Sequence, residues 1–180
     1  DFADDAIAFF DVMNLEQITL VGHSLGSLIA QRVAVAVPEK LARLVLMGST
    51  ANPYTEELSE LKAAVESLQD PVPGEFIYEF QMSTMSDAVP ADFVSTVLME
   101  SNKVKAHVWR ATLNDLIVDE ILSPLEKISM PTLIQYGEKD PIWSRSEQDI
   151  LAARIPNAQL RVYPLLGHAL HWVRPDLIAK

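Results

Sequence analysis

The chain alternates short apolar runs with longer stretches whose apolar residues recur every three or four positions. Four runs are nearly continuous in apolar residues: Gln17–Val21, Leu44–Met47, Met130–Tyr136 and Gln159–Tyr163. A strand of a parallel sheet that helices cover on both faces shows this pattern. Helical patterns separate several of the runs, for example Ser146–Arg154. Together they predict an α/β fold with a mostly parallel sheet flanked by helices.

The amino-terminal residues also have helical periodicity. Phe2, Ile7, Phe10 and Met13 fall on one face of the predicted helix, and aspartates fall on the other. We expect this apolar face to pack against the rest of the molecule. The chain begins with Asp1 rather than methionine, and we expect it to be a piece of a longer sequence.

A long connection separates the second and third runs. It has about 80 residues, whereas a crossover between parallel strands needs only about a dozen. Asn52-Pro53 predicts the start of a helix. The apolar stripe of that helix is Leu58, Leu61, Val65 and Leu68. We expect an inserted helical cap at residues 51–125, between core segments 1–50 and 126–180. The alternative is that these helices only extend the core.

A serine motif follows the first run directly. Gly22–Gly26 reads Gly-His-Ser-Leu-Gly, and a helical stretch follows it. This is the G-x-S-x-G pattern of a nucleophile elbow, in which a sharp strand-to-helix turn exposes the serine hydroxyl. We expect Gly22 to make room where strand and helix approach each other, and Gly26 to let the helix pack closely behind Ser24. The alternative is a turn that merely joins two elements.

A serine hydroxyl needs a base within hydrogen-bond reach, and that base needs an acid to orient it. His168 fits the role of base, because it follows the fourth run in a loop that can reach back over the sheet edge. We expect His171 to pack in the next helix and His107 to lie in a helix of the insertion. His23 adjoins the serine and cannot easily turn its ring onto that hydroxyl.

Asp140 is the candidate acid because it follows the third run. Open parallel sheets gather their sites at the carboxyl ends of the strands, which is where this residue is expected. Asp115 and Asp119, near the end of the insertion, are the alternatives, and a solvated position suits them better. Glu138 lies closer to the run, and we expect it to turn away from the site.

The overall composition is that of an ordinary globular domain. The net charge is −11, and no cluster of Lys or Arg interrupts it. A nucleic-acid partner is therefore not expected, since binding phosphates needs local positive charge. No apolar run is long enough to span a bilayer. The absence of cysteine excludes disulfides and thiolate metal sites.

The order Ser24, Asp140, His168 is that of the α/β-hydrolase triad. The chain resembles the carboxyl-terminal two-thirds of an α/β-hydrolase with a helical cap, and its nearest look-alikes are small esterases and lactonases. The matching segments are Ile18–Gly26, Arg43–Ser49, Pro131–Pro141 and Gly167–Pro175. The resemblance implies Ser24 as nucleophile, His168 as general base and Asp140 as its orienting acid. It also implies the backbone N–H of Leu25 as an oxyanion donor and no metal or organic cofactor.

Members of that family carry further strands before the opening helix, and a loop among them supplies a second oxyanion donor. This chain contains neither. One edge of the strand at Gln17–Val21 is then expected to be bare and apolar, which favours aggregation or pairing with another chain. We expect a missing amino-terminal segment to be needed to complete the sheet, and the chain alone to be poorly stable and weakly active or inactive.

The expected substrate is a small to medium apolar carboxylic ester or lactone. Trp109, Met85 and Ile142 are candidates for an apolar substrate pocket, although a place in the core is the better explanation of any single one. Other serine-elbow reactions stay open: hydrolysis of carbon–carbon bonds, acyl transfer and cofactor-free peroxidation. A non-catalytic ligand-binding protein on the same scaffold is the alternative from a different class. A third reading is a structural remnant that acts only when paired with another chain.

Overall fold

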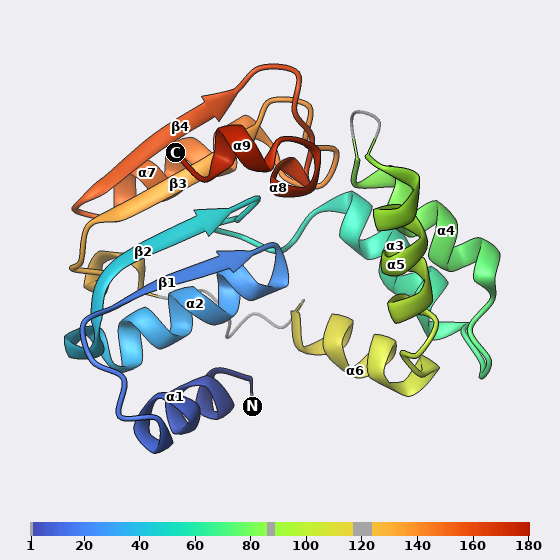
Figure 1. Ribbon diagram of the computed structural model, residues 1–180, viewed down its shortest axis with the longest axis horizontal. Coiled ribbons are helices and arrows are strands. Elements are labelled where there is room, and N and C mark those ends of the chain that lie inside the picture. The colour runs from blue at the N-terminus through green and yellow to red at the C-terminus, as the bar shows by residue number, and fades with distance from the viewer. Residues whose placement is uncertain (1, 86–88, 117–123) are drawn as a thin grey trace.

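The computed structural model describes residues 2–85, 89–116 and 124–180 (Figure 1). Within these ranges the chain forms a parallel sheet of four strands in the order β1-β2-β3-β4. The strands are β1 (Ile18–His23), β2 (Leu41–Met47), β3 (Thr132–Gly137) and β4 (Ala158–Tyr163). The predicted α/β fold with a mostly parallel sheet is confirmed. β2 begins at Leu41 rather than Leu44, because Leu41 already pairs with Ile18.

The register brings the carboxyl ends of the strands to one edge of the sheet. Val45 pairs with Val21 on one side and with Leu133 on the other. Because all four strands run in the same direction, the loops that leave them open onto the same edge. In Figure 1 this edge faces the helices that connect β2 to β3.

Helices pack on both faces of the sheet, as the apolar runs predict. Behind the strands in Figure 1 lie α2 (Leu25–Ala36) and α7 (Arg145–Arg154). The largest buried apolar cluster includes residues from both helices and from the strands between them: Val33, Ala34, Leu44, Leu46, Ile134 and Leu151. Two single turns of 3₁₀ helix, η1 (Pro38–Lys40) and η3 (Leu125–Lys127), precede β2 and β3.

The opposite face is covered near β3 and β4 by two short helices, α8 (Leu170–Val173) and α9 (Pro175–Ile178). The buried side chain of Gln135 points to this face, where its Nε2 donates to the Tyr163 hydroxyl and to the Ile178 carbonyl, both at 3.0 Å. These hydrogen bonds fix the carboxyl-terminal helices against the sheet.

The first helix, α1 (Phe2–Val12), packs on α2 through a face that only partly matches the predicted one. Ala3 and Phe10 are buried, and Ile7 packs against the core. Phe2 and Met13 are each 54% exposed. The prediction that both belong to the buried face was wrong. Met13 lies beyond the last helical residue, where the chain turns toward β1.

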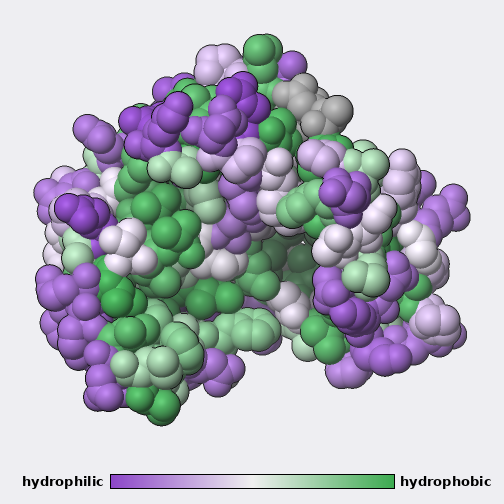
Figure 2. Space-filling view, in the orientation of Figure 1, coloured by the Kyte–Doolittle hydropathy of each residue, from purple (hydrophilic) through white to green (hydrophobic). Residues whose placement is uncertain are grey.

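Helices α3 to α6 form an insertion between β2 and β3, beyond the carboxyl ends of the strands (Figure 1). They are α3 (Glu56–Glu66), α4 (Gly74–Ser83), α5 (Ala91–Ser101) and α6 (Ala106–Leu116). They have an apolar cluster separate from that of the sheet, which Trp143 joins from the loop after β3. Its buried members are Leu58, Val65, Leu68, Val72, Ile77, Ala106, Leu113 and Trp143. Figure 2 shows the surface hollowed between the insertion and the sheet, with hydrophobic residues on its floor.

The start of α3 was predicted at the wrong residue. Thr55 is the N-cap, and its hydroxyl accepts the backbone N–H of Leu58. The Asn52 side chain instead accepts the N–H of Tyr54. Asparagine followed by proline is equally typical of a turn, and here the turn lies before the helix.

The outer edge of β1 pairs with no strand among the residues that the structure describes. Val21, on this edge strand, is 53% exposed. Within residues 2–85, 89–116 and 124–180, no helix is long and apolar enough to cross a membrane.

Candidate active site

Ser24 lies between the last residue of β1 and the first residue of α2, in a strained backbone conformation. Its φ and ψ are 53° and −124°, a region that residues with a Cβ rarely adopt. Its N–H donates to the carbonyl of Met47 at the end of β2, at 3.0 Å. The surrounding sheet and helix therefore hold the serine in a sharp turn, as the motif predicts.

The two glycines of the motif have different surroundings. A Cβ at Gly22 would lie 2.3 Å from the carbonyl oxygen of Gly26, so only glycine fits where β1 and α2 approach each other. A Cβ at Gly26 would meet nothing within 4 Å. The expected close packing at Gly22 is present. The close packing expected at Gly26 is not found among the described residues.

Asp140 and His168 form a buried hydrogen-bonded pair. His168 Nδ1 lies 2.8 Å from Asp140 Oδ2, and the two side chains are 3% and 0% exposed. The other carboxylate oxygen accepts the backbone N–H groups of Ile142 and Trp143, at 2.8 and 3.1 Å. Because a carboxylate oxygen accepts, Nδ1 of the imidazole donates to Asp140 Oδ2.

The imidazole of His168 lies over the end of β2, beside the serine turn. A Cβ at Gly48 would lie 3.0 Å from both Cε1 and Nδ1 of His168. His23 pairs with Met47, so Gly48 and Ser24 are the next residues along the two strands. Gly48 has φ +49°, a second reason for glycine at this position.

Nε2 of His168 is buried and has no hydrogen-bond partner within residues 2–85, 89–116 and 124–180. The structure therefore brings Asp140 and His168 into contact and places the imidazole of His168 beside the serine turn, without a hydrogen bond from Ser24 to His168. Catalytic hydrogen bonds are often long in ligand-free structures and shorten when substrate binds.

The loops that carry the acid and the histidine are bonded directly to each other. Lys139 N–H donates to the carbonyl of Leu166 at 2.8 Å, and Glu138 N–H donates to the carbonyl of Tyr163 at 3.0 Å. These bonds fix the spacing between Asp140 and His168 through the backbone. The side chain of Glu138 is exposed, as expected.

The other three histidines have distinct surroundings. His107 is exposed on α6. The ring of His171 packs on that of His23, with centroids 4.3 Å apart. Burial, followed by the nearby His168 and His171, lowers the pKa of His23 to about 3, and burial followed by His168 lowers the pKa of His171 to about 4. Both rings are therefore neutral near pH 7.

A buried polar network lies beneath the serine turn, and no local sequence signal indicated it. The Ser27 hydroxyl bonds to the carbonyl of Ser24, and the hydroxyls of Ser27 and Ser49 are 2.7 Å apart. Gln31 Nε2 donates to Ser49 Oγ at 2.9 Å, and Gln148 Nε2 donates to the Ser49 carbonyl at 2.8 Å. All four side chains are at most 3% exposed. The network ties α2 and α7 to the loop after β2, and so supports the turn from below.

The three candidate pocket residues lie in different places. Trp109 packs edge-on against Phe76 and Phe80, and lines a cavity of about 250 Å³ within the insertion. Met85 follows α4 and is half-buried. The side chain of Ile142 packs against the apolar cluster of the insertion, so this residue joins the acid loop to the insertion.

The two alternative acids cannot both be compared with Asp140. Asp115 is exposed on α6, and Asp119 lies outside the described residues. The backbone N–H of Leu25 is the first of α2, where N–H groups lack acceptors within the helix. Among the described residues, no group of three or more His, Cys, Asp or Glu is arranged to hold a metal ion.

A family model described as serine aminopeptidase, S33 (Hydrolase_4) matches residues 1–172. The chain belongs to this family of α/β-hydrolases. Curated relatives of this α/β-hydrolase include serine hydrolase BPHL from Mus musculus, 28% identical over 94% of the chain and 54% of the relative. Another is 2-hydroxy-6-oxo-6-phenylhexa-2,4-dienoate hydrolase from Burkholderia cepacia, 25% identical over 92% of the chain and 61% of the relative. A third is monoacylglycerol lipase ABHD6 from Mus musculus, 27% identical over 93% of the chain and 54% of the relative.

Solved structures agree on the fold. An esterase from Exiguobacterium antarcticum superposes with a TM-score of 0.87 at 19% identity, over 99% of this chain and 70% of that one. A thermophilic esterase from Thermogutta terrifontis gives a TM-score of 0.74 at 25% identity, over 98% of this chain and 67% of that one. Of the length of the three curated relatives named above, the chain spans between 54% and 61%.

Proposed function

We propose that this α/β-hydrolase is a serine hydrolase that cleaves small to medium apolar carboxylic esters or lactones through an acyl-enzyme. The observation that carries the proposal is the buried Asp140–His168 pair, 2.8 Å between Oδ2 and Nδ1, beside a serine with φ 53°. A buried acid, an imidazole with a free Nε2 and an adjacent strained serine are the three parts of an activated nucleophile.

In the proposed acylation step, Ser24 Oγ attacks the ester carbonyl while His168 Nε2 takes the hydroxyl proton. Asp140 keeps the imidazole in its Nδ1–H tautomer and stabilises the imidazolium that forms. The tetrahedral oxyanion accepts a hydrogen bond from the Leu25 N–H, at the positive end of α2. The intermediate then collapses, and His168 returns the proton to the departing alcohol oxygen.

The same groups act again in deacylation. His168 Nε2 takes a proton from water, and the resulting hydroxide attacks the acyl carbonyl. Collapse of the second tetrahedral intermediate releases the carboxylic acid and returns the proton to Ser24 Oγ. One oxyanion donor of this kind contributes about 3 kcal/mol to lowering the barrier.

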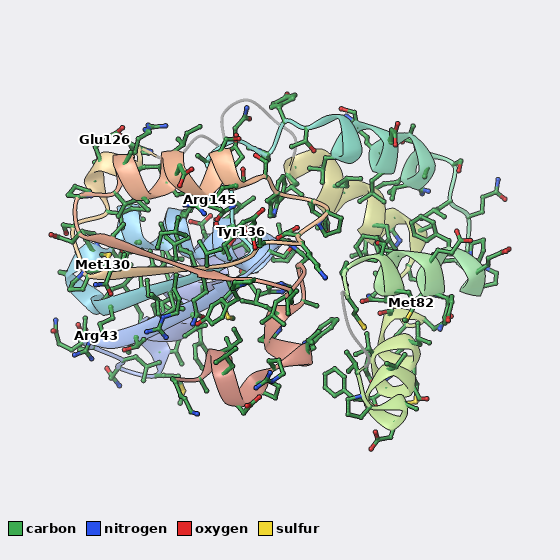
Figure 3. The ribbon with its side chains drawn as sticks, turned by 90° about the horizontal axis from the view of Figure 1, so that it is seen from above. Arg43, Met82, Glu126, Met130, Tyr136 and Arg145 are labelled. Carbon is green, nitrogen blue, oxygen red and sulfur yellow. The ribbon has the colours of Figure 1, made fainter. Side chains whose placement is uncertain are left out.

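Residues 51–125 are proposed to act as a cap over the core segments 1–50 and 126–180. The insertion lies beyond the carboxyl ends of the strands (Figure 1), and the hollow between it and the sheet is lined with apolar residues (Figure 2). Met85 and Ile142 are the proposed pocket residues nearest the His168 and Asp140 loops, and Trp109 lies deeper in the insertion. In the view from above (Figure 3), Met82 lies on α4 and Tyr136 lies at the end of β3.

We also propose that activity needs a further segment beside β1. Val21 on the unpaired edge is 53% exposed, and the space beside Gly26 is open. A strand that occupies this edge would complete the sheet, and its loop would supply the second oxyanion donor. A longer protein that contains such a strand should hydrolyse an activated ester, and the 180-residue chain alone should do so weakly or not at all. Equal activity of the two proteins would contradict the proposal.

Covalent labelling tests the main proposal in a longer protein that contains the segment beside β1. A fluorophosphonate should add once to this protein, as measured by intact mass, and Ser24→Ala should abolish the adduct together with ester turnover. Ser59→Ala, an exposed serine on α3, is the matched control and should keep both. If this longer protein is folded but neither labels nor hydrolyses esters, the result would instead support the non-catalytic binding alternative.

A second candidate substrate comes from the Burkholderia cepacia relative, whose name specifies a 2-hydroxy-6-oxo-6-phenylhexa-2,4-dienoate. Hydrolysis of such a dienoate breaks a carbon–carbon bond with the same serine elbow. Parallel assays of a short-chain ester, a lactone and a dienoate would rank the classes by kcat/KM. A dienoate preference of 100-fold or more, on the order of 3 kcal/mol, would replace the ester proposal.

A further inference from the structure

One peptide group carries the catalytic imidazole and is held on both sides by other parts of the molecule. The carbonyl of His168 lies 3.0 Å from Nε2 of His23. The N–H of the same peptide, on Ala169, donates to the carbonyl of Thr84 at 2.9 Å. His23 is the last residue of β1, and Thr84 caps the carboxyl end of α4 in the insertion.

The direction of the histidine contact follows from its partner. A carbonyl oxygen only accepts, so Nε2 of His23 carries the proton and donates. The bond needs only the neutral ring, which is the form that burial favours in His23. The groups around this ring are the imidazoles of His168 and His171, with centroids 4.9 and 4.3 Å away, and the indole of Trp172 at 6.4 Å.

Three contacts therefore fix the catalytic histidine, and each comes from a different element. Asp140, after β3, holds the side chain at Nδ1. His23, at the end of β1, holds the backbone carbonyl. Thr84, in the insertion, holds the following N–H. Removing the His23 contact leaves the peptide attached to the insertion alone.

We propose that His23 is a positioning residue, which holds the His168–Ala169 peptide so that the His168 imidazole stays over Gly48 and beside Ser24. The inference rests on the proposed function, because it assigns His23 a role in placing the base for Ser24. His23 neither touches substrate nor transfers a proton in this role. A misplacement of a reacting group by about 1 Å can cost about 100-fold in rate.

The kinetic test compares three variants with the unmodified protein, each in a longer form that contains the segment beside β1. His23→Met removes the donor, and we expect kcat for an activated ester to fall about 10- to 100-fold with KM nearly unchanged. The rate of fluorophosphonate addition to Ser24 should fall by the same factor. His23→Gln keeps an N–H donor and should recover most of the rate. His107→Met makes the same change on the exposed face of α6 and should have no effect.

The pH profile separates positioning from general destabilisation. In His23→Met, the acid limb of the kcat/KM profile should shift, because the proposed base has lost its fixed place beside Asp140. A merely destabilised variant would lower activity without moving this limb. An unmodified protein that is inactive would count against the proposed function. An active protein whose His23→Met variant matches it within twofold at every pH would overturn the positioning role alone.

A measurement on the unmodified protein covers the case in which His23→Met does not fold. Nitrogen-15 NMR distinguishes protonated from unprotonated imidazole nitrogens. We expect Nε2 of His23 to be protonated at pH 7 and Nδ1 to be unprotonated. An unprotonated Nε2 would show that the hydrogen bond to the His168 carbonyl does not exist, and would overturn the proposal without any variant.

Discussion

Two regions of the molecule are stabilised by different kinds of contact. One is the strand-end region, the loops around Ser24, Asp140 and His168 at the carboxyl ends of the strands, and the other is the helical insertion, α3 to α6. Around Ser24, buried polar side chains form short hydrogen bonds: Ser27 with Ser49, Gln148 with the Ser49 carbonyl, and His168 with Asp140. In the insertion, the buried contacts are those of an apolar cluster that includes Val65 and Leu113. Hydrogen bonds depend steeply on distance and angle, whereas an apolar cluster tolerates exchange at constant volume. The difference suits a fixed site for chemistry beneath an insertion whose lining can vary.

The largest expected effect lies in the polar region. Asp140→Asn keeps the shape of the acid but no longer holds His168 in the Nδ1–H tautomer. We expect kcat to fall by about 10⁴, as measured with an activated ester, while the fold is retained. Asp115→Asn, at an exposed position in the insertion, is the control and should leave kcat unchanged. A loss below tenfold for Asp140→Asn would remove this residue from the proposed mechanism.

The next effect tests how tightly the serine turn is packed. Gly22→Ala places a Cβ 2.3 Å from the Gly26 carbonyl oxygen, and we expect the free energy of unfolding to fall by at least about 3 kcal/mol. Gly26→Ala is the matched change in open space, and it should be neutral or stabilise the chain by up to about 1 kcal/mol. Urea unfolding of both variants measures the difference. Similar values for the two would mean that the turn is not tightly packed.

Acid should weaken the strand-end region first. The folded-state pKa values of His23 and His171 are lowered to about 3 and about 4, so the unfolded chain binds more protons below pH 6.5. Stability is therefore full above about pH 6.5 and falls as the pH drops, by about 1.4 kcal/mol per pH unit for each ring. Urea unfolding at pH 6.5 and 5 measures this slope. His171→Gln should reduce it, and an unchanged slope would contradict the cause assigned.

A direct comparison exchanges one buried side chain for methionine in each region. Gln148→Met leaves the Ser49 carbonyl without its donor, and we expect a loss of about 1 to 3 kcal/mol in unfolding free energy, together with reduced kcat. Leu113→Met in the insertion conserves volume and should cost less than about 1.5 kcal/mol, with kcat unchanged. If Leu113→Met lowers kcat as much as Gln148→Met does, the contrast between the regions is wrong.

The smallest expected effect lies on the surface. Arg145, which is labelled in Figure 3, pairs with Asp149 one turn along α7, and both side chains are more than half exposed. Exposed pairs at this spacing contribute about 0.3 to 0.5 kcal/mol, so Arg145→Ala should barely change the unfolding midpoint. A loss above about 1 kcal/mol would indicate a role for α7 beyond its buried face.

Local patterns were enough to predict several parts of this protein. The apolar runs predicted the parallel strands, because burial between two layers of helices demands continuous apolar sequence. Gly22 and Ser24 predicted the sharp turn, because the backbone conformation needed there is itself local. Asp140 and His168 were chosen as candidates because each follows a strand, and parallel strands end at one edge.

Local pattern also misled where packing decides the outcome. Asn52 and Thr55 are both good caps, and only the path of the chain into the insertion determines which one starts α3. The face of α1 that becomes buried depends on how the helix lies against α2, so periodicity alone placed Phe2 and Met13 wrongly.

The sequence by itself determined the order of strands and helices, the serine turn and the candidate acid and base, because each depends on neighbouring residues or on strand direction. Only the tertiary structure decided which distant groups meet. The His23 side chain reaches a carbonyl 145 positions along the chain, and Gln148 reaches one 99 positions away. Such contacts leave no periodic trace, because a single polar residue in an apolar stretch looks the same whether or not folding brings it a partner.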